Sequence, residues 1–441
     1  MHRLAFQAVA VSVALALASV AQAADLKSVY EQAKKYDATF AAAEAAAVAG
    51  REKTEQARAL WLPQVNLSTD LNHQNQGTDF ARGNSSSASG TSYDYTVSAS
   101  QPLYNAAASV GNSQLLEQAR LAEVSFAGAR QSLILRVAQA YFDVLYAQDS
   151  LDFVRAQKDA VAQQLAQAKK SFEVGVSTIT DTHEAQASFD AIVASEIASQ
   201  NNLLVKQNAF AQLTGVSADG ISPLVAKMQA TPPEPNDMNS WLKRAEEKSL
   251  EIAGQRSSLA IADADIDRYR TQRQPTLSLV GRYGESWNKG GLASQIEHNK
   301  NGVLGLQLNI PLYTGGATSS KLRESIALRD QAQFKLEATR RDVAQTTKAA
   351  FLGVQSGAAQ IKALEQALVS AQSSLDSTSL GREVGVRTTL DVLNAEQKVY
   401  STKRDLAQAR YAYLVNKLNL SAAVGELAEA DIDAINAQLK H

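Results

Sequence analysis

The feature that most constrains the fold is a short motif that occurs twice, 210 residues apart. It reads VGVSTITD at Val174–Asp181 and VGVRTTLD at Val384–Asp391. Each copy interrupts a long alanine-rich run with a glycine between β-branched residues, a combination that breaks helices. We therefore predict that each copy forms the apex of a helical hairpin, at 174–176 and at 384–386.

The similarity between the two halves extends beyond the apices. QPLY at 101–104 corresponds to IPLY at 310–313, and WLPQVNLS at 61–68 corresponds to RQPTLSLV at 273–280. This period is too long for a solenoid and indicates two copies of a domain-sized motif. The proline-rich stretch TPPEPND at 231–237 cannot form a regular helix. We expect a first repeat at 24–222, a connector at 223–237, a second repeat at 238–427 and a C-terminal tail at 428–441.

Residues 1–23 have the pattern of a secretory signal peptide. Arg3 precedes an apolar run at 8–20, and Ala21-Gln22-Ala23 is a small-x-small cleavage site. The chain is therefore expected to be exported. It contains no cysteine, which excludes disulfides, thiolate metal sites and a lipid-attachment cysteine. Its 45 acidic and 43 basic residues nearly balance, which argues against a nucleic-acid partner.

Four segments alternate between apolar and polar residues with period two, which predicts strands with one apolar face. They lie at about 64–73, 92–101, 276–283 and 303–310, and the polar stretches 74–91 and 284–302 are expected to be loops. Prolines bracket these strands, at Pro63, Pro102, Pro275 and Pro311. Since no run reaches the roughly 18–20 apolar residues of a membrane helix, the strands are the candidates for crossing a membrane. The alternative is a soluble sheet packed on a core.

The remaining segments predict helices. One helix is expected from Leu26 to about Leu60, and return helices are expected at 181–213 and 391–418. Before each apex, apolar residues recur at steps of three and four, which is typical of a coiled-coil seam. A helix at 105–172 would be about 100 Å long. The seam residues are Leu133, Val137, Ala140, Val144, Ala147, Leu151, Val154, Val161, Leu165, Ala168 and Phe172, interrupted by Lys158, and in the second copy Val343, Ala350, Val354, Ile361, Leu364, Leu368, Ala371 and Leu375.

These elements predict a mainly α fold with membrane β-strands, arranged as two repeats of a strand pair and a long helical hairpin. Four strands cannot close a barrel, and open sheet edges do not occur in lipid. The chain must therefore oligomerise. Two copies would supply eight strands, a barrel filled by its own side chains, whereas three copies would supply twelve and leave an open lumen.

The order helix, strand, loop, strand, long helix, apex and return helix, present twice, resembles the TolC family of outer-membrane efflux proteins. The most specific part is VGVRTTLDVLNAEQKVYSTKRDLAQARYAYLVNKLNLSAAVGEL at 384–427. The resemblance covers essentially the whole mature chain. It implies a homotrimer with a twelve-stranded outer-membrane barrel continued by a twelve-helix α-barrel in the periplasm. It also implies a periplasmic adaptor protein, an inner-membrane pump of the ABC or RND type, drug efflux or type I secretion, and no cofactor.

The resemblance also implies a gate at the periplasmic end, where an arginine after the second apex contacts an aspartate after the first. The matching residues are Arg387 and Asp181, with Thr180 beside the aspartate. A guanidinium can donate to a carboxylate and a hydroxyl at once. Alternatively, Arg387 and Asp181 are solvated charges near helix ends, with Asp181 as the N-cap of its helix.

Two positions depart from the family pattern at this gate. Arg382 stands where the family has a tyrosine that partners the aspartate, and we expect that Arg382 could form a second ion pair instead. Asn394 stands where the family has an aspartate lining the constriction, so Asp391 is expected to supply the remaining acidic ring. Carboxylate rings favour cations over anions. We therefore expect weaker cation selectivity than is usual in the family.

The apices resemble the tip motif that meets the adaptor, and a plain helix–helix turn is the alternative. The tip residues are Val174, Gly175, Val176, Val384, Gly385 and Val386. Aromatic residues near the strand ends suggest an interfacial girdle, with packing within the sheet as the alternative. These aromatics are Tyr93, Tyr95, Tyr104, Tyr283, Trp287 and Tyr313.

No enzyme motif is present, and the five histidines have no metal-ligand spacing, so the sequence indicates a protein that is not an enzyme. The main rival to a channel is an exported coiled-coil scaffold or adaptor that bridges layers of the envelope. Such a scaffold has no need for four alternating strands, which is the feature that separates the two hypotheses.

Overall fold

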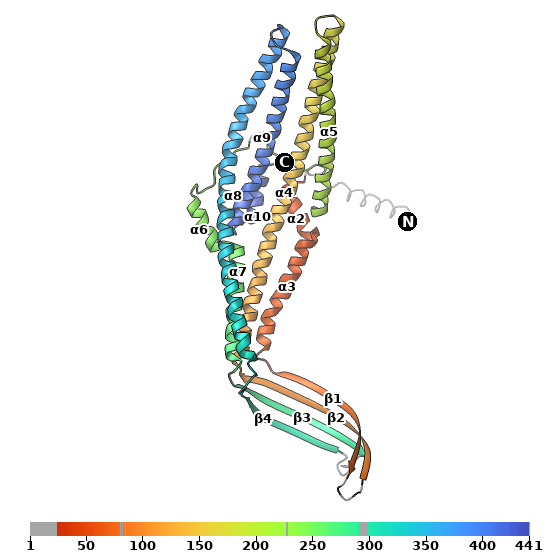
Figure 1. Cartoon of the computed structure of the whole chain (residues 1–441), viewed down its shortest axis with the longest axis vertical. Helices are drawn as coiled ribbons and strands as arrows, with labels where there is room; N and C mark the ends of the chain where they lie inside the picture. The colour runs from red at the N-terminus through yellow and green to blue at the C-terminus, as the bar shows by residue number, and fades with distance from the viewer. Residues whose placement is uncertain are drawn as a thin grey trace, which may run out of the picture. The chain divides into compact units, whose positions relative to one another are not determined.

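The computed structural model describes residues 24–79, 81, 83, 85–225, 228–290 and 298–440, so the predicted signal peptide lies outside the described residues. The mainly helical fold with few strands is confirmed (Figure 1). The chain forms two compact units. Unit 1 contains residues 24–44, 126–252 and 340–440, and unit 2 contains residues 45–125 and 253–339.

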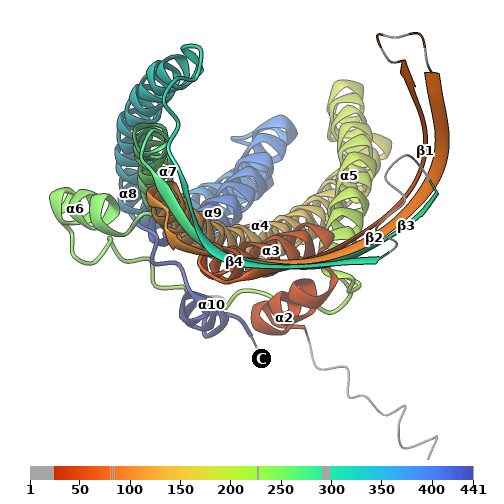
Figure 2. The same cartoon turned by 90° about the horizontal axis from the view of Figure 1, so that it is seen from below.

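Unit 2 holds a four-stranded antiparallel sheet in the order β1-β2-β3-β4. Figure 2, which views the sheet close to edge-on, shows that it is curved. The strands are β1 (Gln64–Asp79), β2 (Ser85–Tyr104), β3 (Thr276–Gly290) and β4 (His298–Asn309). Strand pairing follows the chain in each repeat, and β2 with β3 joins the two repeats. The sheet is therefore built by both copies of the motif.

The strands run further than the alternation predicts. The expected loop 74–91 is mostly strand, because β1 continues to Asp79 and β2 begins at Ser85, and β3 likewise extends through part of the expected loop 284–302. Apart from Trp287, these segments consist mainly of Ser, Asn, Gly, Gln and other small or polar residues, so no alternation marks them. Hydrogen bonds between the backbones of paired strands do not require apolar side chains. The prediction of loops was therefore wrong in these segments. Pro102 also lies inside β2, at a shift of register, where a missing N–H is tolerated.

Cross-strand pairing places most of the large apolar residues of the four strands on one face of the sheet, with Val280 and Val303 as exceptions. Leu67 pairs with Val97, Val97 pairs with Tyr283, and Leu279 pairs with Leu306. Directly opposed residues lie on the same face. In the single chain this face is exposed, with Leu67 70% and Leu304 80% accessible. A soluble sheet would cover such a face with a core.

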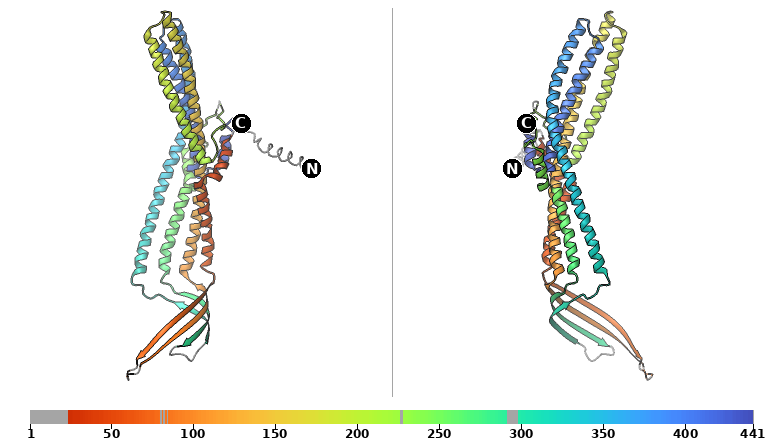
Figure 3. Two further views of the ribbon diagram at one scale, coloured as in Figure 1. Left: turned by 90° about the vertical axis from the view of Figure 1, so that its right-hand side faces the viewer. Right: turned by 60° about the vertical axis from the view of Figure 1, so that its left-hand side comes forward.

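Unit 1 contains the turns of two helical hairpins, α4 (Ala106–Glu173) with α5 (Ile179–Thr214) and α8 (Ala317–Glu383) with α9 (Thr389–Ala423). Figure 3 shows that the two turns lie at the same end of these helices. The seam residues from Leu133 to Ala168 are buried or half-buried, whereas Phe172 is exposed. Lys158, the polar residue in that seam, forms an ion pair with Glu196 of α5 at 2.7 Å. Among the described helices, none is both long enough and apolar enough to cross a lipid bilayer.

The single helix predicted from Leu26 to Leu60 is wrong, because the chain forms α2 (Leu26–Tyr36) and α3 (Ala38–Ala59) with a break at Asp37. The Asp37 carboxylate accepts from the N–H groups of Thr39 and Phe40 and from the Arg136 guanidinium. Burial would raise the pKa of Asp37, but these hydrogen bonds, led by that from Arg136, hold the pKa below its usual value. The break is thus stabilised by a cap and by a contact to α4 that local sequence does not reveal.

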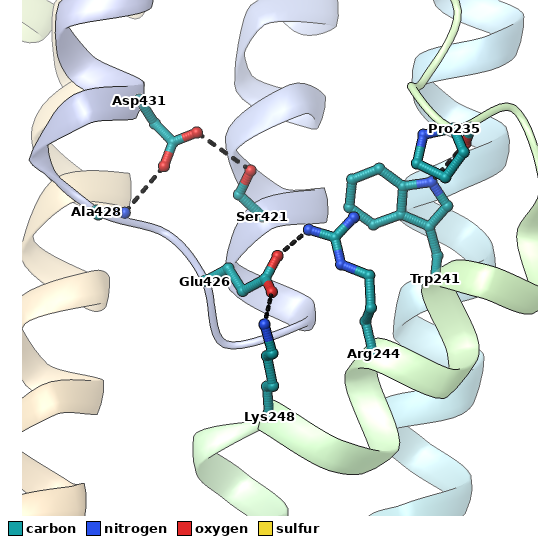
Figure 4. Close-up of polar contacts among 8 residues, drawn as sticks. All are labelled: Pro235, Trp241, Arg244, Lys248, Ser421, Glu426, Ala428 and Asp431. Atoms are coloured by element: carbon teal, nitrogen blue, oxygen red, sulfur yellow. Dashed lines mark hydrogen bonds and ion pairs between the residues drawn. The ribbon is translucent and has the colours of Figure 1, made fainter.

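The remaining helices of unit 1 are α6 (Met238–Lys248) and α10 (Glu429–Asn436), and α7 (Leu250–Thr271) begins there and continues into unit 2. Figure 4 shows Glu426, just after α9, between Arg244 and Lys248 of α6. The Lys248 Nζ lies 2.6 Å from the Glu426 carboxylate, and the Arg244 guanidinium stacks 4.3 Å from the Trp241 ring. The Trp241 indole in turn donates to the Pro235 carbonyl. These contacts connect α6 and the inter-repeat segment to the end of α9.

Candidate functional site

Both apices are Schellman turns, which explains why each contains a glycine. After α4, the Val176 N–H donates to the Ser171 carbonyl and the Gly175 N–H donates to the Phe172 carbonyl, both at 2.9 Å. After α8, Val386 and Gly385 make the matching bonds to Gly381 and Arg382. The turn requires a left-handed residue at the glycine position, and φ is 75° at Gly175 and 81° at Gly385.

A substitution at the apex glycine is expected to destabilise the hairpin. Gly385→Ala should lower the free energy of unfolding by about 1–2 kcal/mol, because an L side chain at positive φ is strained. Gly128→Ala is the matched control, since Gly128 lies within α4 with no atom near its added Cβ. That change should raise the free energy of unfolding by about 0.5–1 kcal/mol. Urea-induced unfolding followed by circular dichroism measures both, and equal effects of the two changes would contradict this account of the apex.

Each return helix begins with the same capping box. Thr178 is the N-cap of α5, and the Asp181 carboxylate accepts from Ser177 Oγ and from the N–H and hydroxyl of Thr178 at 2.6–2.9 Å. Thr388 and Asp391 repeat this arrangement at α9. These hydrogen bonds, from Ser177 first in the case of Asp181 and from the Thr388 N–H first in the case of Asp391, hold the pKa of each carboxyl below its usual 3.8. Both aspartates are therefore charged and oriented near neutral pH.

The structure does not bring Arg387 and Asp181 together within the described part of one chain, where no ion pair joins them. Arg387 and Thr180 are exposed. Arg387 lies near Asp391, whose pKa it helps to lower, and its stem runs beside Gly381, where an added Cβ would lie 2.8 Å from Arg387 Cγ. The alternative hypothesis, in which Asp181 is the N-cap of α5, is wrong in its position. The N-cap is Thr178, and Asp181 is the N3 residue of the capping box.

No ion pair of Arg382 is present within the part of one chain that the structure describes. Its guanidinium instead donates to the side-chain carbonyl oxygens of Gln164 and Gln167, both on α4. The amides satisfy the guanidinium because α4 lies beside the end of α8. Asn394, which replaces the second carboxylate, is exposed on the first turns of α9.

Sequence reasoning missed Gln164, Gln167 and Glu396 at this site. Glu396 is only 6% exposed, and the Gln164 side-chain amide donates to it at 3.3 Å. One signal was available: Glu396 falls between Val392 and Val399 at seam spacing, where a carboxylate is out of place. The two glutamines carried no such signal.

The four apex valines are exposed, with accessible fractions between 66% and 77%. They are Val174, Val176, Val384 and Val386. Each turn thus exposes a pair of apolar side chains, a small patch suited to a protein partner. The described residues contain no group of three or more acidic, histidine or cysteine side chains that could hold a metal ion.

Some aromatic residues of the sheet pack against one another. The Trp287 ring lies between those of Tyr93 and Tyr95, at centroid distances of 5.7 and 5.5 Å. Exposure does not separate this cluster from the other aromatics, since Tyr93 and Tyr283 are both 47% exposed, Tyr104 is 49% exposed and Tyr313, beyond the end of β4, is 87% exposed. The interfacial girdle therefore stays a prediction.

Most of the chain matches a known protein family. The profile of the family described as "Outer membrane efflux protein" matches residues 29–216 and 241–426. "Outer membrane protein TolC" of Vibrio cholerae is 35% identical over 426 residues, covering 96% of each chain. "Alkaline protease secretion protein AprF" of Pseudomonas aeruginosa is 29% identical over 417 residues, covering 92% of this chain and 86% of the relative.

Solved structures share the fold. The outer membrane protein VceC of Vibrio cholerae superposes with a TM-score of 0.76 at 19% identity, covering 91% of this chain and 96% of that one. The CmeC outer membrane channel of Campylobacter jejuni superposes with a TM-score of 0.78 at 15% identity, covering 94% and 90%. At such identities the likeness concerns the fold alone.

Proposed function

Because the chain belongs to the family of outer membrane efflux proteins, we propose that three copies form one channel, with a twelve-stranded barrel in the outer membrane and a twelve-helix tunnel in the periplasm. Each copy supplies four strands and the four long helices α4, α5, α8 and α9. The chain is an outer-membrane channel of efflux and type I secretion systems, and it is not an enzyme.

The observation that carries the assembly is the open sheet. β1 and β4 each have one edge without a partner strand among the described residues, and the sheet exposes a continuous apolar face. Lipid excludes unpaired backbone groups, so each outer edge needs a strand from a neighbouring copy. The number three follows the resemblance to the TolC family, and a barrel of that size leaves a water-filled lumen.

Exposed apolar side chains on the hairpin helices support the same assembly. On α5 these are Ile197, Leu204 and Val205, and on α8 they are Val369 and Leu380. All of them are more than half exposed in the single chain, although they lie on regular helices that could have buried them. Contact with the helices of neighbouring copies would cover them, as a closed ring of helices requires.

We place the gate where Arg387 of one copy meets Asp181 and Thr180 of the next, and call this contact the latch. The Asp181 carboxylate accepts its intrachain hydrogen bonds mainly on Oδ2, so Oδ1 remains for the guanidinium. The capping box fixes the direction of this carboxylate. Asp391 of each copy supplies an acidic ring nearby.

The apices are the docking site for a periplasmic adaptor, which connects the channel to an inner-membrane pump of the ABC or RND type. The relatives suggest both kinds of cargo, since AprF is named for protease secretion and BepC of Brucella suis is named an efflux protein. The rival function, an envelope-bridging scaffold, leaves the exposed apolar face of the sheet without a role.

Two measurements test the proposal. The mature chain, purified in detergent, should have the mass of a trimer and should form channels in planar bilayers, and a monomer soluble without detergent would refute it. Because the chain has no cysteine, Val176→Cys or Val386→Cys allows cross-linking at a single site. These variants should capture an adaptor in cells, whereas Gln366→Cys, 17 residues before the end of α8, should not.

A further inference from the structure

Glu396 is a buried carboxylate in the apolar seam of α9, near the gate. It is 6% exposed, and the buried residues Val392 and Val399 flank it at seam spacing. Its neighbour one turn earlier, Leu393, packs with Val161 and Leu165 of α4. Burying a carboxylate among apolar side chains is costly unless it is paired. Glu396 is therefore kept at a cost in stability, which calls for a role other than packing.

The carboxylate is incompletely paired. Gln164 Nε2 donates to Glu396 Oε1 at 3.3 Å, while Glu396 Oε2 is buried and has no hydrogen-bond partner. On its other side, Gln164 Oε1 accepts from Arg382, and Arg382 also donates to Gln167 Oε1 at 2.7 Å. A chain of contacts thus runs from Glu396 of α9 through Gln164 of α4 to Arg382 of α8.

The chemistry of these groups permits one orientation of the Gln164 amide. A guanidinium only donates and a carboxylate only accepts, so the amide oxygen must face Arg382 and the amide nitrogen must face Glu396. A flipped amide would set NH₂ against the guanidinium and oxygen against the carboxylate. The charge on Glu396 therefore keeps Gln164 in the orientation that binds Arg382.

We propose that Glu396 is a positioning residue of the gate, which orients Gln164 so that the end of α8 is held against α4 in the closed channel. Arg382 is the last residue but one of α8, directly before the second apex, and Arg387 of the latch follows that apex. If Arg382 lost its hydrogen bonds to Gln164 and Gln167, the end of α8 and the second apex would no longer be held against α4. The inference rests on the proposed function, because it assumes that the apices form a gate.

The titration of Glu396 gives the contact a dependence on pH. Burial raises the pKa of Glu396 above its usual 4.5, and the Gln164 hydrogen bond and the Arg382 charge offset only part of that rise. Arg382 is the facing charge from α8, Tyr400 lies one turn along α9, and Asp159 of α4 acts on Tyr400. As pH falls towards 4.5, Glu396 is protonated before an ordinary glutamate, and its hold on Gln164 weakens.

Planar-bilayer recordings of the full-length trimer test this role. At neutral pH, Glu396→Leu should raise the open-to-closed ratio about five-fold, the size expected for one lost hydrogen-bonded contact. Arg382→Leu should do the same, and the double variant should show no further rise, because both changes break one contact. Asp405→Asn removes an exposed carboxylate from the same helix and should behave as wild type.

Two readouts separate positioning from a merely structural role. The thermal midpoint of Glu396→Leu should equal or exceed that of wild type, since an apolar residue replaces a poorly paired buried charge. In addition, the wild-type open fraction should rise as pH falls from neutral towards 4.5, whereas that of Glu396→Gln should stay flat.

The inference fails if wild type forms gated channels but Glu396→Leu has the wild-type open fraction, or if its effect adds fully to that of Arg382→Leu. It also fails if Glu396→Gln keeps the wild-type response to pH. If wild type itself forms no channel, it is the proposed function that fails.

Discussion

A chain carrying Leu306→Arg is expected to fail to insert into the outer membrane, whereas one carrying Gln307→Arg is expected to insert. Leu306 lies on the apolar face of the sheet, paired with Leu279 and 67% exposed in the single chain. Gln307 is the next residue of β4 and lies on the opposite face, paired with Ser278. The two variants add the same side chain one position apart.

The expected difference comes from the solvent that each face meets. An arginine on the lipid face near the bilayer midplane costs about 2–4 kcal/mol. The cost is incurred once per copy, so a trimer would lose roughly three times as much. In the proposed barrel, an arginine at position 307 would face the water-filled lumen and keep its hydration. This contrast depends on the β-strand period of two and on which face meets lipid.

Cell fractionation and the yield of trimer in the outer-membrane fraction measure the effect. Leu306→Ala controls for loss of the leucine without a charge and should insert. Equal insertion of the two arginine variants, or failure of Gln307→Arg alone, would show that the apolar face does not meet lipid.

The second large effect is expected at the latch: Arg387→Ala should raise single-channel conductance in planar bilayers. Three exposed ion pairs of about 0.2–1 kcal/mol each would bias the gate shut by roughly 1–3 kcal/mol. Their loss would change the open-to-closed ratio by about 5–150-fold. Lys398→Ala, which removes an exposed cation from α9, is the control. Unchanged conductance in Arg387→Ala would exclude the latch.

The partner residue needs a more careful substitution. Asp181→Ala would remove both the latch carboxylate and the capping box of α5, so a rise in conductance could reflect a frayed helix. Asp181→Asn keeps one side-chain oxygen that can accept from Thr178 and Ser177, while it removes the charge and replaces the other oxygen with NH₂. It should raise conductance as Arg387→Ala does, and the double variant should open no further.

The pH window of the latch differs from that of Glu396, because the pKa values of the two carboxyls are shifted in opposite directions. Hydrogen bonds from Ser177 and Thr178 lower the pKa of Asp181 below 3.8, so its charge is present above that value and is lost only as pH falls below it. Glu396 has a raised pKa and responds above 4.5. The Asp181→Asn substitution should therefore leave the response between neutral pH and 4.5 intact.

Local patterns predicted much of the fold. Alternation at Val65, Leu67 and Leu71 marks a strand, and the structure has β1 there. The polar ends of the strands were missed because side chains that are hydrophilic on both faces carry no period. The break at Asp37 was also missed, because a residue far along the chain, Arg136, helps to stabilise it. Both failures have one cause: the structure there depends on backbone pairing or on a distant side chain, and the periodicity of neighbouring side chains reveals neither.

At the candidate site, some features could be predicted from the sequence and others could not. The apices and the spacing of Thr178 with Asp181 and of Thr388 with Asp391 are readable from the sequence, because a glycine turn and a capping box each involve residues only a few positions apart. The glutamine partners of Arg382 were not readable, and the ion pair expected for this residue stays a prediction. An arginine can satisfy its donors with any nearby acceptor, and the sequence does not say which acceptor is near.

By itself, the sequence determined the duplicated plan, the helix-breaking turns and the alternating strands, since these follow from the conformational preferences of neighbouring residues. Tertiary structure alone decided the contacts of the gate region. Gln164 meets Arg382 across 218 residues and Glu396 across 232. Such pairs are set by how long helices pack side by side, a geometry that depends on every seam residue along their length, and no local stretch encodes it.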